Sequence, residues 1–216
     1  MLEETGGAPD TTKVEQGSTE WLQARVGSIG ASRLHEVLAK TKTGWGASRA
    51  NVMATLVVER LTGAPVETFS NAAMQWGNEQ EQSAREAYEF YANVSVEKVG
   101  LIRHPTILNA HASPDGLIGD DGLVEIKCPT SATHIETLLN QRVAEKYMIQ
   151  MQWQMAVTGR VWCDFVSYDP RMPEEMRLWK SRITRDQGRI EELEREVRIF
   201  LGEVDAKVEQ LVRTYR

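Results

Sequence analysis

The stretch SPDGLIGDDGLVEIKCP, residues 113–129, decides the fold of this 216-residue chain. The GDDG tetrapeptide at 119–122 is a turn signal, and the segments on either side of it, 108–118 and 122–128, have strand-like patterns. We therefore expect a β-hairpin here. Helical patterns come before and after this central group of strands, so the sequence predicts an α/β (α+β) fold in which a mixed β-sheet is flanked by helices.

Hydrophobic periodicity and capping signals place the other elements. Helices are expected at about 18–25, 31–40, 48–61, 71–91, 131–139, 142–158 and 186–213. Strands are expected at 94–99, 101–103, 160–168 and 176–184, and an exposed loop at 40–46. The last helix is amphipathic, with apolar residues at three- and four-residue spacing. These elements predict one domain over residues 14–216, preceded by a mobile N-terminus at 1–13.

Composition limits the class of protein. With 41% hydrophobic and 26% charged residues, the chain is typical of a globular domain that builds its own core. Its two cysteines, Cys128 and Cys163, give neither a disulfide framework nor a zinc spacing, which favours a reducing, intracellular setting. The N-terminus has no apolar signal-peptide region, and no stretch approaches the ~18 apolar residues of a membrane span. We expect a cytoplasmic protein with no membrane partner.

The net charge of −6 argues at first sight against a nucleic-acid partner, because phosphate binding depends on lysine and arginine. The charge is unevenly distributed, however. Residues 21–62 carry six basic and two acidic side chains, whereas residues 63–126 carry ten acidic and three basic ones. A basic segment beside an acidic one is typical of a metal-dependent enzyme acting on a polyanion, although solvated helix faces produce similar blocks.

Asp115, Glu125 and Lys127 are the first candidates for chemistry. In a strand, residues i and i+2 share a face, so Glu125 and Lys127 point together. If the hairpin turn is centred on Asp120, Asp115 lies directly across from Glu125. Two such carboxylates repel each other unless a cation lies between them, and hard oxygen ligands suit Mg²⁺. The alternative is a simple turn at 114–116 with an exposed Glu125–Lys127 pair.

Glu81 is a further candidate ligand. On the expected 71–91 helix it lies at the edge of a mostly apolar stripe, where a carboxylate needs a partner. That partner is either Arg85, four residues further on, or a metal ion. The four histidines have no metal-ligand spacing and no nucleophile elbow is present, which disfavours zinc and serine-hydrolase chemistry. The six tryptophans and eight methionines are interpreted as packing residues, with Met74 as an exception.

The candidate residues fit a family pattern. Asp115 followed by Glu125-x-Lys127 is the signature of PD-(D/E)XK nucleases, and the surrounding sequence resembles the phage lambda exonuclease family (lambda-type alkaline exonucleases). Six motifs carry the resemblance, in family order, over about residues 14–172: RVGSIGAS (25–32), WGxxxE (76–81), SPDGL (113–117), EIKCP (125–129), YMIQMQ (147–152) and YDPRM (168–172). Many nucleases share the ExK core, but the linked set is far more specific.

The resemblance implies a restriction-endonuclease-like core and a Mg²⁺-dependent 5′→3′ exonuclease. Such an enzyme degrades one strand of double-stranded DNA to mononucleotides and leaves a 3′ single-stranded overhang. Asp115 and Glu125, with the main-chain carbonyl of Ile126, would hold one metal ion, and Glu81 with Asp115 would hold a second. Mn²⁺ is an expected substitute. Lys127 would orient or activate the attacking water, in a two-metal in-line displacement.

The resemblance also assigns residues to the DNA end. Four would surround the 5′-phosphate of the strand being digested: Arg25, Ser32, Ser113 and Gln150. Met74 falls where the family has an apolar wedge that splays the terminal base pair, and Lys42 falls in a loop that touches the duplex. Both depart from the family, in which a leucine and an arginine stand at these positions.

The family implies an assembly and a setting as well. Its members form ring-shaped homotrimers, and a single-strand annealing protein is the expected partner in phage-type homologous recombination. The C-terminal helix would serve the trimer interface or pack on its own subunit. The gene would be carried by a phage or prophage and the protein would act in the bacterial host cytoplasm. Two alternatives stay open: a site-specific PD-(D/E)XK endonuclease, and a non-catalytic DNA-binding or adaptor protein.

Overall fold

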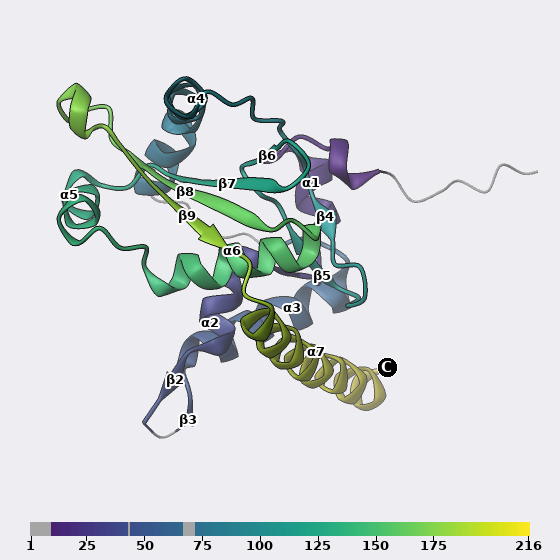
Figure 1. Cartoon of the computed structure of the whole chain (residues 1–216). Helices are drawn as coiled ribbons and strands as arrows, with labels where there is room; N and C mark the ends of the chain where they lie inside the picture. Colours follow the sequence, from purple (N-terminus) through teal and green to yellow (C-terminus); the bar gives the residue numbers. More distant parts are fainter. Residues whose placement is uncertain (1–9, 43, 67–71) are drawn as a thin grey trace, which may run out of the picture.

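A computed structural model describes residues 10–42, 44–66 and 72–216, and within these ranges the side chains of 72–74 are left out (Figure 1). The α-helices are α1 (Thr19–Ala24), α2 (Leu34–Leu38), α3 (Ala47–Thr62), α4 (Ala72–Ala92), α5 (Ser131–Asn140), α6 (Glu145–Thr158) and α7 (Gln187–Tyr215). Short 3₁₀ helices are η1 (Thr11–Lys13), η2 (Ala31–Arg33) and η3 (Glu174–Met176). The described chain therefore alternates helices and strands, as the sequence predicts.

The strands form two sheets and a separate hairpin. The larger sheet has the order β6 (Gly116–Ile118), β7 (Gly122–Lys127), β8 (Trp162–Tyr168) and β9 (Leu178–Thr184). The smaller sheet has the order β1 (Ile29–Gly30), β5 (Ala110–Ala112) and β4 (Ile102–Arg103), and β2 (Lys40–Thr41) pairs with β3 (Gly44–Trp45). β7 runs parallel to β8, while β6 and β9 are antiparallel to their neighbours. The sheet is thus mixed, as predicted.

The hairpin of β6 and β7 has the register that the sequence predicts. Gly116 pairs with Val124 and Ile118 with Gly122, so the turn is centred on Asp120. Extending this register by one residue puts Asp115 opposite Glu125. The GDDG turn therefore brings the two carboxylates to the same end of the sheet.

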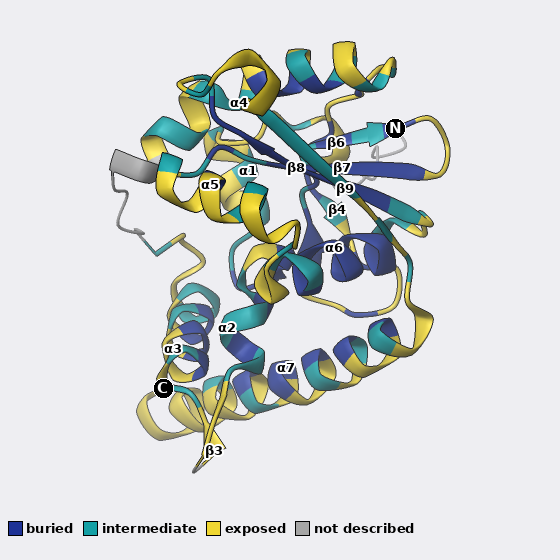
Figure 2. Cartoon of the chain, turned by 60° about the vertical axis from the view of Figure 1, so that its left-hand side comes forward, coloured by how far each residue is buried: buried dark blue, intermediate teal, exposed yellow. Residues whose placement is uncertain are grey.

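Each face of the large sheet has its own hydrophobic core. Leu123, Cys163 and Phe165 face a large core to which α6, α3 and α7 contribute. Val124, Ile126 and Val166 face a smaller core shared with α4. In Figure 2, α6 is buried along most of its length, which fits its place beneath the sheet. Glu125 shares the face of Leu123, so it points toward α6 rather than toward solvent.

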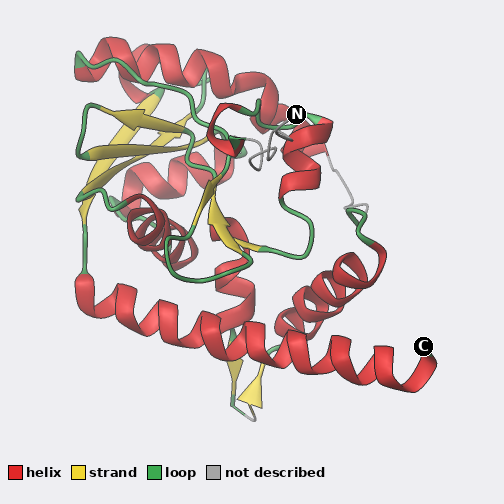
Figure 3. Ribbon diagram, turned by 90° about the vertical axis from the view of Figure 1, so that its right-hand side faces the viewer, coloured by secondary structure: helices red, strands yellow, loops and turns green. Residues whose placement is uncertain are grey.

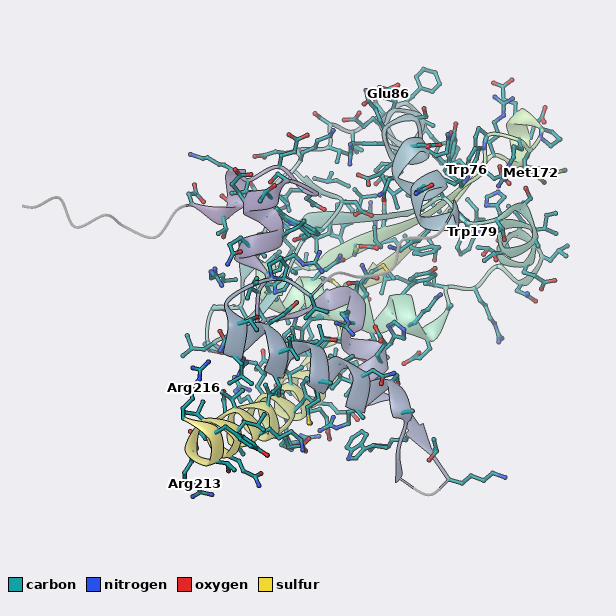
Figure 4. The ribbon with its side chains drawn as sticks, turned by 180° about the vertical axis from the view of Figure 1, so that it is seen from behind. Trp76, Glu86, Met172, Trp179, Arg213 and Arg216 are labelled. Carbon is teal, nitrogen blue, oxygen red and sulfur yellow. The ribbon has the colours of Figure 1, made fainter. Side chains whose placement is uncertain are left out.

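The C-terminal helix α7 packs on its own chain. Its buried residues recur at helical spacing: Ile190, Leu193, Val197, Phe200, Leu201 and Val204. Two arginines of α3, Arg49 and Arg60, form ion pairs with Glu203 and Asp205 of α7. Figure 3 shows α7 running along one edge of the molecule, and in Figure 4 Arg213 and Arg216 mark its far end. The predicted helix at 186–213 is confirmed, with two further residues at its end.

Five local expectations are wrong. The segment expected as one strand at 108–118 is divided into β5 and β6, which belong to different sheets. The segment 94–99 is not a strand, because its backbone pairs with the sheet only through a bridge between Glu97 and Leu117. The expected loop at 40–46 contains the β2–β3 hairpin. The helix expected at 31–40 is divided into η2 and α2, and that at 142–158 begins at Glu145.

The expected mobile N-terminus at 1–13 lies largely outside the described residues. Residues 1–9 lie outside the described residues. Thr11 and Thr12, however, accept main-chain hydrogen bonds from Leu101 and Gly100, at 2.9 and 2.7 Å. Thr11 and Thr12 are therefore bonded to the body of the fold. Within the described ranges, no helix is long and apolar enough to cross a membrane.

The tight contact between β7 and β8 gives a prediction for stability. A Cβ on Gly122 would overlap the indole ring of Trp162, which is its strand partner and is itself stacked on Arg182. Gly122→Ala is expected to lower the free energy of unfolding by about 1–3 kcal/mol. Gly202→Ala is the matched control, because this α7 glycine has open space and alanine favours the helix by about 0.5–1 kcal/mol. Urea unfolding measures the free energy of unfolding of both variants. Equal values would contradict the tight contact between Gly122 and Trp162.

Candidate active site

A cleft of about 690 Å³ opens at the end of the β6–β7 hairpin. Its walls come from α1, η2, α4, α6 and the end of β7. Nine residues singled out in the sequence line this one cleft: Arg25, Ser32, Glu81, Ser113, Asp115, Glu125, Ile126, Lys127 and Gln150. Segments more than 100 residues apart in the chain therefore converge on a single site.

Asp115 and Glu125 are fixed by the hairpin. Asp115 directly precedes β6, and its Oδ2 accepts a hydrogen bond from the main-chain N–H of Ile126 at 2.7 Å. This bond ties the carboxylate to the strand that carries Glu125. Glu125 is fully buried. The alternative of a simple turn with an exposed Glu125–Lys127 pair is therefore wrong.

Both oxygens of Glu125 are held by polar groups. Gln150 donates from Nε2 to Oε1 at 2.7 Å, and Gln154 donates from Nε2 to Oε2 at 2.6 Å. The two glutamines are four residues apart, so they lie on one face of α6. The ammonium group of Lys127 forms an ion pair with Oε1. These three donors compensate for the lost hydration of a buried carboxylate.

The charged groups of the cleft shift one another's pKa. Burial raises the pKa of Asp115 well above its usual value of 3.8, and the negative charges of Glu125 and Glu81 raise it further. For Lys127, burial disfavours the ammonium ion, but Glu125 and Asp115 outweigh this effect and raise the pKa. The site therefore has more carboxylate charge than its neighbouring lysine neutralises, and it favours additional positive charge.

Glu81 reaches the cleft from α4 and is paired with Arg85. Arg85 also donates to the main-chain oxygen of Asp115 at 3.2 Å. The ion pair expected from the i, i+4 spacing thus exists, and it lies in the wall of the cleft. Arg85 links α4, and with it Glu81, to the start of β6.

The donor set of the cleft is suited to a divalent metal ion. Three carboxylate residues, Glu81, Asp115 and Glu125, line this cleft together with Ile126, and hard oxygen donors such as carboxylates suit Mg²⁺. Within the described residues, no three His, Cys, Asp or Glu side chains are already arranged around a metal position. The reason lies in their present partners: Glu125 is turned to glutamines and Lys127, and Glu81 to Arg85.

His111 also lines the cleft. Its Nδ1 is 2.8 Å from Ser28 Oγ. Burial lowers the pKa of His111 to about 3, and the charges of Arg25 and Arg103 act in the same direction. The ring is therefore neutral at physiological pH.

Arg25 and Ser113 line the same cleft and both contact Trp21. The guanidinium group of Arg25 stacks on the Trp21 ring, 4.0 Å from the ring centre. Trp21 Nε1 donates to Ser113 Oγ at 3.1 Å. Ser32, from η2, lines the same cleft. Arginine and two hydroxyls form a donor set for a phosphate group. Trp21 holds two of these donors and was not singled out in the sequence.

Three of the residues assigned to the DNA end need separate description, and the contacts of Lys42 and Met74 with DNA stay predictions. Gln150 lines the cleft, but its amide is bonded to Glu125. Lys42 is exposed in the turn of the β2–β3 hairpin, which projects from the body of the molecule (Figure 1), and among the described residues it does not line the cleft. Met74 lies in the first turn of α4, and its side chain is outside the described residues.

α4 is anchored close to the site by a contact that the sequence did not indicate. Arg171 stacks on the Trp76 ring at 4.4 Å and is held by the buried carboxylate of Asp169. In Figure 4, Trp76 lies beside the loop that carries Met172. This contact joins the YDPRM segment to the helix of Glu81. It also explains in physical terms why motifs so far apart in sequence occur together.

The hairpin, the buried Glu125 and the adjacent Lys127 define the class of the fold, which is that of the PD-(D/E)XK nucleases. The chain belongs to the family of the YqaJ-like viral recombinase domain, whose model matches residues 20–161. A comparison with curated protein sequences gave no significant match.

Solved structures agree with this assignment. The chain is similar to the alkaline exonuclease LHK-Exo from Laribacter hongkongensis, at 50% identity and a TM-score of 0.86, over 91% of this chain and 97% of that one. The same values hold for the structure of LHK-Exo in complex with dAMP. A phage-related exonuclease from Haemophilus somnus 129PT shares the fold at 16% identity and a TM-score of 0.66, over 85% and 96% of the chains. The resemblance to lambda-type exonucleases is thus confirmed.

The repulsion among the carboxylates predicts that the metal-free site destabilises the fold. Because the native pKa of Asp115 is raised, the native state binds more protons than the unfolded state, and stability falls as pH rises above about 4. Asp115→Asn should therefore raise the melting temperature at pH 8 in the presence of a chelator. The gain should disappear near pH 3, where the unfolded carboxyl is protonated as well. A variant that is less stable at pH 8 would contradict this description.

Proposed function

We propose that this protein is a Mg²⁺-dependent 5′→3′ exonuclease that degrades one strand of double-stranded DNA to mononucleotides and leaves a 3′ single-stranded overhang. The observation that carries the proposal is the joining, in one cleft, of the Asp115–Glu125–Lys127 cluster to the Arg25–Ser113 donor pair. The first cluster suits phosphodiester hydrolysis and the second suits a terminal phosphate. The 50% identity to a protein named alkaline exonuclease supports the same activity.

The metal-binding residues follow from the donor set. Asp115, Glu125 and the Ile126 carbonyl would hold one Mg²⁺, and Asp115 with Glu81 a second, with Mn²⁺ as a substitute. When bound, the two ions supply charge for the attacking and leaving oxygens of an in-line displacement. For Glu81 to serve as a ligand, its carboxylate must exchange the ion pair with Arg85 for the metal.

Lys127 acts from the rim of the same cluster. Its ammonium group stays charged, since Glu125 and Asp115 raise its pKa. It has donors but no acceptor, so it can orient the attacking water and balance the charge that develops on the phosphate. It is held in place by the ion pair with Glu125 and by the Tyr147 ring, 5.4 Å from the ammonium nitrogen.

The phosphate end depends on Arg25, Ser32 and Ser113. Ser113 Oγ accepts the Trp21 N–H, so its own hydroxyl hydrogen can be donated toward the cleft. Stacking on Trp21 keeps the guanidinium of Arg25 in a fixed plane, which suits bidentate contact with phosphate oxygens. A bound 5′-phosphate would place the first phosphodiester bond toward Asp115. Gln150 donates one amide N–H to Glu125, and its second N–H could reach the phosphate.

The biological setting is part of the proposal. Membership in a viral recombinase family supports a role in phage-type recombination by single-strand annealing in the host cytoplasm, with an annealing protein as partner. We propose a ring-shaped homotrimer, in which an acidic protein needs a positive surface only along its channel. Lys42 and Met74 are proposed to contact the duplex and its terminal base pair.

A site-specific endonuclease is the second candidate. It would need the Asp115–Glu125–Lys127 cluster but has no use for a terminal-phosphate site. A non-catalytic adaptor would need neither the cluster nor the phosphate site. The presence of the four charged residues argues against a decayed site: Glu81, Asp115, Glu125 and Lys127. The Arg25–Ser113 pair therefore favours the exonuclease.

The nuclease test compares linear and covalently closed duplex DNA in the presence of Mg²⁺. We expect digestion of the linear form alone, and none with a chelator. Asp115→Ala should reduce the rate to background, because it removes the ligand shared by both ions. Lys127→Ala should also be inactive yet bind Mg²⁺, since an ammonium group is not a ligand. Cleavage of closed circles would favour the endonuclease, and an active Asp115→Ala enzyme would contradict the site.

The polarity test uses end-labelled duplexes that differ only in a 5′-phosphate or 5′-hydroxyl. The phosphorylated duplex should be digested faster, by about ten- to hundredfold if a charge-assisted contact of roughly 1.5–3 kcal/mol is made in the rate-limiting complex. Arg25→Ala should remove most of this preference. Arg33→Ala, which changes an arginine on the neighbouring 3₁₀ helix that pairs with Glu36, is the control. Equal rates for the two ends, or loss of label from the 3′ terminus, would contradict the proposed polarity.

A further inference from the structure

The two glutamines that hold Glu125 occupy different surroundings. Gln150 lines the cleft, whereas Gln154 lies one helical turn further on and is fully buried, outside the cleft lining. Gln150 and Lys127 both contact Oε1 of Glu125, and Gln154 contacts Oε2. Oε1 is therefore the oxygen on the cleft side of the carboxylate, and Oε2 is directed toward the core.

The orientation of the Gln154 amide is determined by Glu125. Its Nε2 donates to Oε2 at 2.6 Å, while its own Oε1 has no hydrogen-bond partner among the described residues. If the Gln154 amide were flipped, its Oε1 would lie against Oε2 of Glu125, and two acceptors would face each other. A buried carbonyl without a donor is costly, and the charge-assisted bond to Glu125 opposes this cost. Among the described residues the Gln154 side chain thus has a single hydrogen bond, and its partner is a proposed metal ligand.

We propose that Gln154 is a positioning residue: it holds Oε2 of Glu125 toward the core and so presents Oε1 to a divalent cation in the cleft. This inference rests on the proposed function, because it concerns the cation that Asp115 and Glu125 would bind. Gln154 itself does not reach the cleft.

Loss of this bond changes what Glu125 can do. Without a donor on Oε2, the carboxylate can rotate about its last torsion and offer both oxygens to the Lys127 ammonium group. The cation would then compete with a stronger ion pair for a ligand that is no longer fixed. Groups that orient a ligand from behind in this way usually affect metal affinity by 10–100-fold when removed. We expect a loss of this size.

The same helix provides a matched control. Gln152 is also a buried glutamine of α6, but it bonds to the Thr184 carbonyl and to the Asp186 N–H, both at 2.9 Å. These bonds fix the entry into α7 and do not involve the cleft. Gln152→Met should therefore lower the melting temperature and leave metal affinity unchanged.

The experiment measures Mn²⁺ binding by calorimetry, without DNA, for the wild type, Gln154→Met and Gln152→Met. Methionine has nearly the volume of glutamine and no donor. We expect Gln154→Met to bind Mn²⁺ about 10–100-fold more weakly, with a melting temperature in chelator no lower than that of Gln152→Met. On linear DNA at one fixed Mg²⁺ concentration below saturation, its kcat should fall while the KM for DNA ends stays within twofold. Gln154→Asn, whose amide is too short to reach Oε2, should behave alike and replaces the methionine variant if that does not fold.

The outcomes separate the two claims. If wild-type protein binds no Mn²⁺ and digests no DNA, the proposed function itself fails. If the wild type binds and digests, but a folded Gln154 variant has wild-type Mn²⁺ affinity, the positioning role is wrong. An equal loss of affinity in Gln152→Met would also contradict it, because the effect would then come from the stability of α6.

Discussion

The burial of one carboxylate, Glu125, constrains the rest of this structure. An isolated carboxylate in a protein core is strongly disfavoured, so the chain must provide donors on every side. The hairpin provides Lys127 from the same strand, and α6 provides Gln150 and Gln154 from beneath the sheet. This requirement fixes the rotation and the height of α6 against β7. It also ties the packing of the domain to the geometry of the cleft.

A second buried carboxylate, that of Asp164, lies on the opposite face of the sheet and is stabilised by different groups. Asp164 on β8 is also fully buried, but it accepts hydrogen bonds from Arg182 and from the Tyr88 hydroxyl on α4. Burial alone would raise its pKa, and these bonds outweigh the effect and lower it. The carboxylate of Asp164 is therefore fully hydrogen-bonded, and its bond to Tyr88 links α4 to the sheet. In the cleft, by contrast, burial raises the pKa of Asp115 and the charges of Glu125 and Glu81 raise it further, which is typical of a functional site.

The sequence was most informative where the relevant contacts are local. The GDDG turn indicated the hairpin register, and with it the position of Asp115 opposite Glu125. A short turn between two antiparallel strands leaves few possible pairings of their residues. The burial of Glu125 could not be predicted, since its donors Gln150 and Gln154 are 25 and 29 residues away and their role depends on how α6 docks. Segment 94–99 alternates like a strand but lacks a neighbouring strand to pair with beyond Glu97. The i, i+4 spacing of Trp21 and Arg25 could have indicated their stacking, but the sequence analysis did not use it.

The central claim is that Asp115, Glu125 and the Ile126 carbonyl form a divalent-cation site at the end of the hairpin. Anomalous X-ray scattering from crystals soaked in Mn²⁺ tests it most directly. We expect a peak within coordination distance of oxygens from Asp115 and Glu125 and of the Ile126 carbonyl, with Lys127 displaced from Oε1. A cleft without a peak in crystals saturated with Mn²⁺, or a peak bound only by other residues, would contradict it.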